Sequence, residues 1–457
     1  MTATTAPTAS TPPQLPPPGP ARRRRRARAT PVLRLRIQAA AALVLVAALL
    51  VGALTAFSLA RSDLDRLASV SEPRAVAAAD LSQALADQDA QHADTLVVGY
   101  ASTPPAPGQQ PTLVADGVLA ELTAQADRRR ISADLAVLAA SYPAGSAGDR
   151  TVQGLLNSLS LYDTLSGTSE FSATSQQDPV VGRPPELALD YYDLAEGQLQ
   201  QTTLPQAAQL LAQAQQQVAA DGGTARRDDR LGALLLGLLG LATLALLLRW
   251  QRDLARRHRR VLNPALLLAT ACVLAVLLSA TTSLLGAADQ VATAVDRGYA
   301  PYTVAALGQV EAANAEASES RWLVDDAYRV PLQQTYTGLM DDLERQLAGQ
   351  TGDPAVARTR TAYLAADARL RQYADAGQLD QASVQLTGVT RGEVAFASYD
   401  FSTQLGRLAQ QGLQVVDVHL AAAGGDLSGW VVLPSALLGA ALVLVLVGVR
   451  PRLAEFA

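Results

Sequence analysis

The stretch that decides the fold is residues 37–60, which read IQAAAALVLVAALLVGALTAFSLA. It holds no charged residue, and its only strongly polar side chain is Gln38. A helix of these 24 residues, at about 1.5 Å per residue, is long enough to cross the roughly 30 Å hydrocarbon core of a membrane. A soluble core helix would interrupt such a run with a charged face. The stretch therefore predicts a first transmembrane helix.

Three further apolar runs have the same character, at residues 231–248, 265–285 and 430–449. Only 4% of the residues are aromatic, and the chain is rich in Ala, Leu, Gln and Arg, a composition that favours helix over a β-sandwich or barrel. The sequence thus predicts an all-α membrane protein with four transmembrane helices. None of the four runs carries an ionisable residue in its interior, which speaks against an ion-coupled transporter.

Charge predicts the orientation. Segments 1–36, 249–260 and 450–457 carry net charges of +8, +5 and +1, whereas segments 61–230 and 287–428 carry −11 and −8. Basic flanks stay in the cytoplasm. We therefore expect a multi-pass protein of the cell membrane with both termini and the short loop inside and both large segments outside.

The first apolar run has a second interpretation, as a secretory signal. Ser58-Leu59-Ala60 is a small-x-small pattern that a signal peptidase accepts. The run is longer than the about 7–15 residues of a signal peptide's apolar region, which favours an uncleaved anchor.

An internal repeat is predicted by two matches within the chain. A shift of 228 residues places Pro73 on Pro301 and Tyr100 on Tyr328. A shift of 207 residues aligns 186–194 with 393–401, with four of nine positions identical. Equivalent positions relative to the next apolar run favour duplication.

Each outer segment is expected to fold as a four-helix bundle, giving two tandem extracytoplasmic bundles. In the first we expect helices at 61–100, 113–140, 151–165 and 186–220, the last kinked at Pro205 and ended by Asp221-Gly222-Gly223. In the second we expect helices at 287–327, 331–348, 354–376 and 381–423, followed by Gly424-Gly425. In the last helix, Val394, Phe401, Leu405 and Leu408 fall on one face.

The search for chemistry finds no phosphate loop, nucleophile elbow, zinc-protease motif or dinucleotide fingerprint. A single cysteine, Cys272, excludes a disulfide scaffold, and the histidines His92, His258 and His419 are far apart in sequence. His92 and Asp89 lie one helical turn apart, but a polar helix face facing solvent is the simpler interpretation. We therefore predict a non-enzymatic protein without metal or cofactor.

Two sets of residues stand out as candidates for binding. Tyr192-Asp193 and Tyr399-Asp400 recur in both copies and are the candidate ligand-binding residues, although tyrosines that pack between helices would give the same pattern. The basic residues Arg22, Arg23, Arg24, Arg25, Arg26, Arg256 and Arg257 are the candidate contacts for lipid headgroups or a cytoplasmic partner, with a topology signal as the alternative. The segment before them, 1–20, is proline-rich and predicts disorder.

The layout resembles the periplasmic four-helix sensor modules of chemoreceptors and histidine kinases, duplicated and without an output domain. More narrowly, it resembles the actinobacterial GlnX-type four-span membrane proteins. The stretch 89–99, DAQHADTLVVG, is similar in style to their first outer helix. The resemblance implies two partners, an extracytoplasmic glutamine-binding lipoprotein and a soluble cytoplasmic Ser/Thr kinase.

Two functions remain open at this point. The first is a sensor that relays an extracytoplasmic signal, such as amino-acid availability through a solute-binding protein, to a separate cytoplasmic partner. The second is a structural scaffold of the cell envelope that senses nothing. Gly232, Gly237 and Gly240 allow close helix packing or a homodimer in the membrane. Nothing in the sequence indicates nucleic-acid binding.

Overall fold

The computed structural model describes residues 31–98, 111–175, 180–258, 263–348, 353–430 and 432–454. These residues are almost entirely helical, as predicted. The α-helices are α1 (Pro31–Arg66), α2 (Glu72–Val98), α3 (Pro111–Ser141), α4 (Ala147–Thr174), α5 (Glu186–Gln198), α6 (Leu204–His258), α7 (Pro264–Thr293), α8 (Ala300–Val324), α9 (Arg329–Ala348), α10 (Pro354–Asp375), α11 (Leu379–Thr387), α12 (Val394–Asp426) and α13 (Val432–Ala454).

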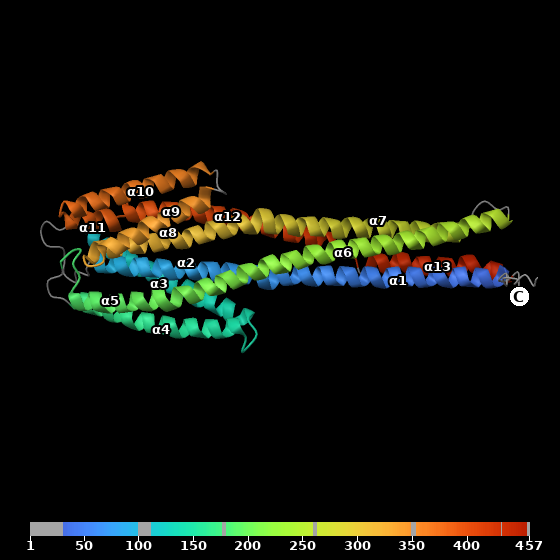
Figure 1. Cartoon of the computed structure of the whole chain (residues 1–457), viewed down its shortest axis with the longest axis horizontal. Helices are drawn as coiled ribbons and strands as arrows, with labels where there is room; N and C mark the ends of the chain where they lie inside the picture. Colours follow the sequence, from blue (N-terminus) through green and yellow to red (C-terminus); the bar gives the residue numbers. More distant parts are fainter. Residues whose placement is uncertain are drawn as a thin grey trace, which may run out of the picture.

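The molecule is a long rod with different helices at its two ends (Figure 1). At one end α1, α6, α7 and α13 run side by side, and we call these four helices the stem. At the other end lie a first helix group, α2 to α5 with the start of α6, and a second helix group, α8 to α12. The two groups meet where α2 packs against α8.

Three continuous helices are long and apolar enough to cross a membrane, namely Arg36–Val97, Glu186–Arg256 and Pro264–Val324. Each joins a stem helix to a helix of one group. A fourth apolar helical stretch, Val432–Gly448 within α13, is shorter than these three helices. It packs in the stem against α1 and α7. The long apolar helices indicate that the protein is associated with a membrane.

Each of the three continuous helices contains one π-helical turn: Leu67–Ser71, Leu199–Thr203 and Ala294–Tyr299. Every one of these turns ends two residues before a proline, at Pro73, Pro205 and Pro301. A proline inside a helix has no N–H to donate, and its ring clashes with the carbonyl four residues earlier. A π turn widens the helix at that point, so the chain continues as one rod instead of breaking.

The fourth connection between stem and groups is interrupted. α12 ends at Asp426, and Gly429 adopts a positive φ of 74° before α13 begins at Val432. The ring of Trp430 in this turn stacks on Phe57 of α1 with ring centroids 4.1 Å apart. The turn is therefore anchored to α1 by this stacking, in addition to its backbone hydrogen bonds with α12 and α13.

Three expected boundaries are wrong, and in two of them a glycine is the physical reason. The pair Gly222-Gly223 does not end a helix, because α6 runs through it, and a Cβ at Gly222 would lie 2.8 Å from Val295. Here glycine allows two helices to approach closely instead of capping one. The expected helix 381–423 is split into α11 and α12, because Gly392, at a φ of 103°, takes a conformation outside any helix. The helix expected at 151–165 extends to Thr174.

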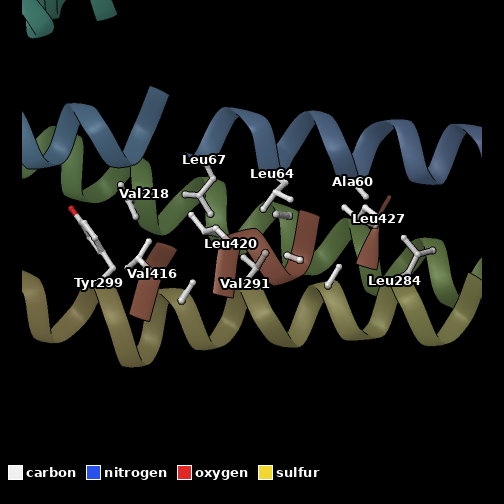
Figure 2. Packing of buried hydrophobic residues seen from close by; sticks show 14 of the residues in the cluster. Ala60, Leu64, Leu67, Val218, Leu284, Val291, Tyr299, Val416, Leu420 and Leu427 are labelled. Atoms are coloured by element: carbon white, nitrogen blue, oxygen red, sulfur yellow. The ribbon is translucent and has the colours of Figure 1, made fainter. Parts of the chain in front are cut away.

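One apolar core runs from the stem into the first helix group without a break. Figure 2 shows its middle part, where α1, α6, α7 and α12 meet. Leu64, Leu420, Val291 and Leu284 point into this junction from three of these helices. This core also includes Tyr302 of α8 and Val416 of α12, so the stem is packed continuously against helices of both groups.

The second helix group has a core of its own. Val394, Phe401 and Leu405 of α12 are buried in it and Leu408 packs against it, which confirms the predicted apolar face. α12 also reaches the π turn of α7–α8 at a very close approach: a Cβ at Gly412 would lie 2.8 Å from the carbonyl oxygen of Gly298. The two glycines thus bring these backbones together.

Candidate functional site

The polar stretch of α2 is buried between helices of both groups instead of facing solvent. Only 1% of Asp89 and 8% of His92 is exposed, and Asp94 is also buried. The expectation that this helix face is solvated is therefore wrong. Asp89 and His92 lie against Tyr192 of α5 in the first group, whereas Asp94 accepts a hydrogen bond from Ser320 of α8 in the second. These partners lie 100 or more positions away in the sequence.

A cavity of about 450 Å³ lies between the two groups along this face. The first group contributes α2 and α3, and the second contributes α8, α12 and the segment after α11. Its apolar wall includes Leu119, Val389 and Phe396, and its polar wall includes Gln83, Asp87, Gln91, Asp94, Thr123, Arg130, Glu316, Ser398, Tyr399 and Ser402. We call it the first cavity.

The first cavity has more acidic than basic side chains. Three carboxyl groups line it, from Asp87, Asp94 and Glu316, against one guanidinium, from Arg130. The hydroxyl of Ser320 donates to Asp94 at 2.5 Å, and that of Ser398 donates to Glu316 at 2.7 Å. Hydroxyl donors orient carboxylates without neutralising them, so the cavity keeps an excess of negative charge.

Burial makes this charge costly, and the pKa values move accordingly. Burial raises the pKa of Asp87 and, together with the charges of Asp94 and Asp87, raises the pKa of Glu316 well above its usual range. Behind Asp87, burial and the charge of Asp87 raise the pKa of Asp127 to about 7, although Arg130 donates to Asp127 at 3.0 Å. These shifts mean that a cation bound among the carboxyl groups would stabilise their charged forms.

A second cavity, of about 290 Å³, lies on the other side of the contact between the groups. The first group contributes α5 with Tyr192, Asp193 and Glu196, and the second contributes Arg321 of α8 and the start of α9. Arg321 is 4% exposed and forms an ion pair with Glu196. Burial and then the charge of Asp325 raise the pKa of Asp193 to about 6.

A buried polar cluster lies behind the second cavity. The hydroxyl of Tyr192 donates to Asp89 at 3.5 Å, and the His92 ring lies 5.5 Å from the Tyr192 ring. Burial raises the pKa of Asp89, while Arg321 lowers it. Burial lowers the pKa of His92 to about 4, so the ring is neutral at pH 7. Among the described residues, Asp89 Oδ2 and His92 Nε2 have no hydrogen-bond partner.

The recurring Tyr-Asp pairs lie on different cavities and do not meet. Tyr192 and Asp193 line the second cavity, whereas Tyr399 lines the first. Tyr192 is 1% exposed and Tyr399 is 73% exposed, so the matched positions have different surroundings. Asp400 accepts a hydrogen bond from Gln404 on its own helix at 3.4 Å. Their role in ligand binding stays a prediction.

The other residues singled out in the sequence are dispersed. Arg22 to Arg26 lie outside the described residues, Arg256 is exposed on α6, and Arg257 lies in the last turn of that helix. His419 hydrogen-bonds Gln290 at 2.5 Å, and Cys272 is partly buried in α7. Where the structure describes the chain, no three His, Cys, Asp or Glu side chains are grouped to hold a metal ion.

Sequence reasoning missed Asp87, Asp94, Arg130, Glu316 and Arg321. One signal was available. Small apolar residues occur on every side of α2 and of α8, a composition that indicates a helix buried all round. Ionisable residues in such a helix are buried with it, and buried ionisable groups concentrate at functional sites.

Comparison with known proteins gives one match. Residues 63–223 match the model of a family described as the actinobacterial sensor domain. This range covers the first helix group and stops before the second. No curated protein and no solved structure matches the chain. The match supports a sensor-like protein of actinobacterial type and a sensing role.

Proposed function

We propose that the protein is a non-enzymatic transmembrane sensor that crosses the membrane four times and detects a small cationic solute outside the cell. The observation that carries this proposal is the first cavity, a recess between the helix groups that is partly open to solvent. More carboxyl groups than guanidinium groups line it, and it is bounded by α2 and α8, which continue into the stem.

The four-span arrangement is supported by the stem. Three of its helices are long and apolar, and α13 packs beside them with a shorter apolar stretch. The basic segments lie next to one end of the stem and the acidic segments form the helix groups at the other, as the positive-inside rule requires for extracytoplasmic groups. The matched positions of Pro73 and Pro301, each after a π turn, support duplication of an ancestral unit.

The ligand class follows from the polar wall. A solute with an ammonium or guanidinium group would compensate Asp87, Asp94 and Glu316, and its apolar part would lie against Leu119 and Phe396. Arg130 offers a partner for a carboxylate at the other end. Basic amino acids and polyamines are the solutes that fit this description.

The signal would travel as a small displacement of helices. A ligand that contacts α2, α8 and α12 together stabilises one relative position of these helices, by as much as its affinity differs between the two states. Shifts of about 1–2 Å between packed helices are sufficient for such switching. α2 and α8 are continuous with α1 and α7, so a shift reaches the stem directly.

The output would belong to another protein. The proposed cytoplasmic loop, 249–260, is too short for an output domain. The resemblance to GlnX-type proteins suggests a Ser/Thr kinase as the cytoplasmic partner and a solute-binding lipoprotein as an alternative route for the ligand. The exposed Arg256 is a candidate contact for the former.

Calorimetry on the full chain in lipid nanodiscs tests the proposal. We expect arginine, lysine or putrescine to bind and glutamate not to bind. Glu316→Gln should weaken binding at least about tenfold, because a hydrogen bond to a charged group contributes about 1.5–3 kcal/mol. Asp341→Asn, which removes the same charge from an exposed position on α9, is the matched control.

The pH dependence of binding gives a second readout. Asp127, with its pKa raised to about 7, becomes neutral as the pH falls, so affinity for a cation should fall below about pH 7. Cation binding unaffected by Glu316→Gln would place the ligand elsewhere. Binding of neutral or anionic solutes alone would contradict the ligand class. If the chain forms a stable complex with a solute-binding protein but binds no free solute, that partner is the protein that detects the solute.

A further inference from the structure

The stem carries a groove between α1 and α13 that the sensing function does not use. Its volume is about 500 Å³, and its walls are Ala39, Ala40 and Leu43 of α1 and Val443, Val445, Leu446 and Val447 of α13. Val443, Leu446 and Val447 are among the exposed large apolar side chains of the protein. The groove is thus an apolar channel on the outside of the stem, where the proposed membrane would surround it.

Two charged side chains close one end of this groove. Arg36 lines it from the first turns of α1, and Arg450 lines it from the last turns of α13. Both arginines are exposed. They lie at the end of the stem that the charge distribution assigns to the cytoplasm. The groove therefore combines an apolar length with a pair of guanidinium groups at the level of the headgroups.

We propose that this groove binds one anionic phospholipid of the inner leaflet. Its phosphate would lie between Arg36 and Arg450, and one acyl chain would lie along the apolar walls. The guanidinium group binds phosphate oxygens in a bidentate fashion, and basic pockets between transmembrane helices on the cytoplasmic side bind anionic headgroups. The proposal requires the stem to span the membrane, and it does not depend on the ligand of the first cavity.

Charge complementarity favours a lipid over a second copy of the chain. In a symmetric dimer across this groove, Arg36 and Arg450 of one copy would face the same arginines of the other, and like charges at close range repel. A lipid phosphate compensates both arginines at once. A zwitterionic lipid brings its own cation and would gain less from the pair.

Native mass spectrometry of the full chain in detergent tests the site. Phosphatidylglycerol or phosphatidylcholine is added at equal concentration, and the fraction of protein that retains one lipid is measured. We expect phosphatidylglycerol to be retained preferentially. Arg36→Gln and Arg450→Gln should each weaken its binding about fivefold, from the contribution of about one basic residue near an anionic headgroup.

Two control variants separate this site from other lipid contacts. Arg61→Gln with Arg66→Gln removes two positive charges, one more than either test variant, from exposed positions at the other end of α1 and should leave retention unchanged. Ala40→Trp fills the groove and should reduce retention of both lipids. Circular dichroism confirms that each variant is folded.

Three results would overturn the proposal. Equal retention of the two lipids would mean that only ordinary annular lipid is bound. If the Arg61 and Arg66 control lowers the retention of phosphatidylglycerol as much as Arg36→Gln does, the headgroup lies elsewhere. In a Cys272→Ser background, an Ala40→Cys variant that forms a disulfide with position 40 of a second copy, with no lipid retained, would make the groove a dimer interface.

Discussion

At the scale of single residues, charges buried inside the protein are compensated by charges from the other helix group. Arg321 comes from the second group, and both Glu196 and Asp89 come from the first. Two carboxyl groups thus share one buried guanidinium. Such an arrangement adds little net stability compared with apolar packing, but it penalises any structure in which the groups are apart.

Arg321→Gln should therefore destabilise the protein by about 3 kcal/mol, because it leaves the charge of Glu196 and the buried Asp89 without a cation. Thermal unfolding followed by circular dichroism measures the loss. The matched control is Arg345→Gln, which removes an ion pair between the exposed Arg345 and Asp342 and should cost less than about 1 kcal/mol. Equal losses of stability in the two variants would mean that the buried ion pair contributes no more than an exposed one.

Residues also mark the limit of what the sequence predicts. The apolar face of α12 can be predicted because the apolar residues recur with the period of a helix, and Phe401 and Leu405 are buried as expected. The surroundings of His92 and Asp89 cannot be predicted in this way, because both pack against Tyr192 of α5, which lies 100 or more positions away in the sequence. Polar character alone gives no indication of a distant partner.

At the scale of elements, the recurrent feature is a proline tolerated inside a long helix by a π turn. The physical cause is the missing N–H of the proline, which in Pro301 leaves the carbonyl of Arg297 without its usual donor. The sequence predicted a kink at Pro205, and the structure instead widens the helix there and continues it. Local propensity identified the position of the proline but predicted the wrong outcome, because whether the helix kinks or continues depends on the helices that pack along both sides of it.

Pro301→Ala should restore the missing donor and return the turn 294–299 to α-helical geometry. Hydrogen exchange at residues 298–303 should then slow, because the helix recovers part of the about 3 kcal/mol that an interior proline costs. Pro354→Ala, at the first turn of α10 where no N–H bond is lost, is the control and should leave exchange in α10 nearly unchanged. Faster exchange at 298–303 would mean that the π turn is held by packing and not by the proline.

At the scale of the whole molecule, the fold class was predictable and the assembly of the two halves was not. Length and hydropathy indicate the long apolar helices, and three of them are present as such. The contact between α2 and α8 and the cavities beside it depend on how two separately coded groups dock. The hydrophobic periodicity of either group does not predict how the two groups pack against each other.

The proposed orientation makes a direct prediction for the whole chain. In a background in which Cys272 is replaced by serine, single cysteines are introduced at Ser175, Asp326 and Arg256. In spheroplasts, a membrane-impermeant maleimide should label positions 175 and 326, because both helix groups are outside. Position 256 should react only after permeabilisation. Labelling of position 256 together with 175 in intact spheroplasts would exclude the arrangement.

The two cavities also bear on which fragments of this chain are useful. The part that resembles a known sensor family, residues 63–223, supplies α2 and α3 to one cavity and α5 to the other. Each cavity takes its remaining wall from the opposite half. A fragment cut at the family boundaries would therefore contain half of each recess and a complete version of neither. Binding studies therefore need the entire chain, because each recess is assembled from residues of both halves.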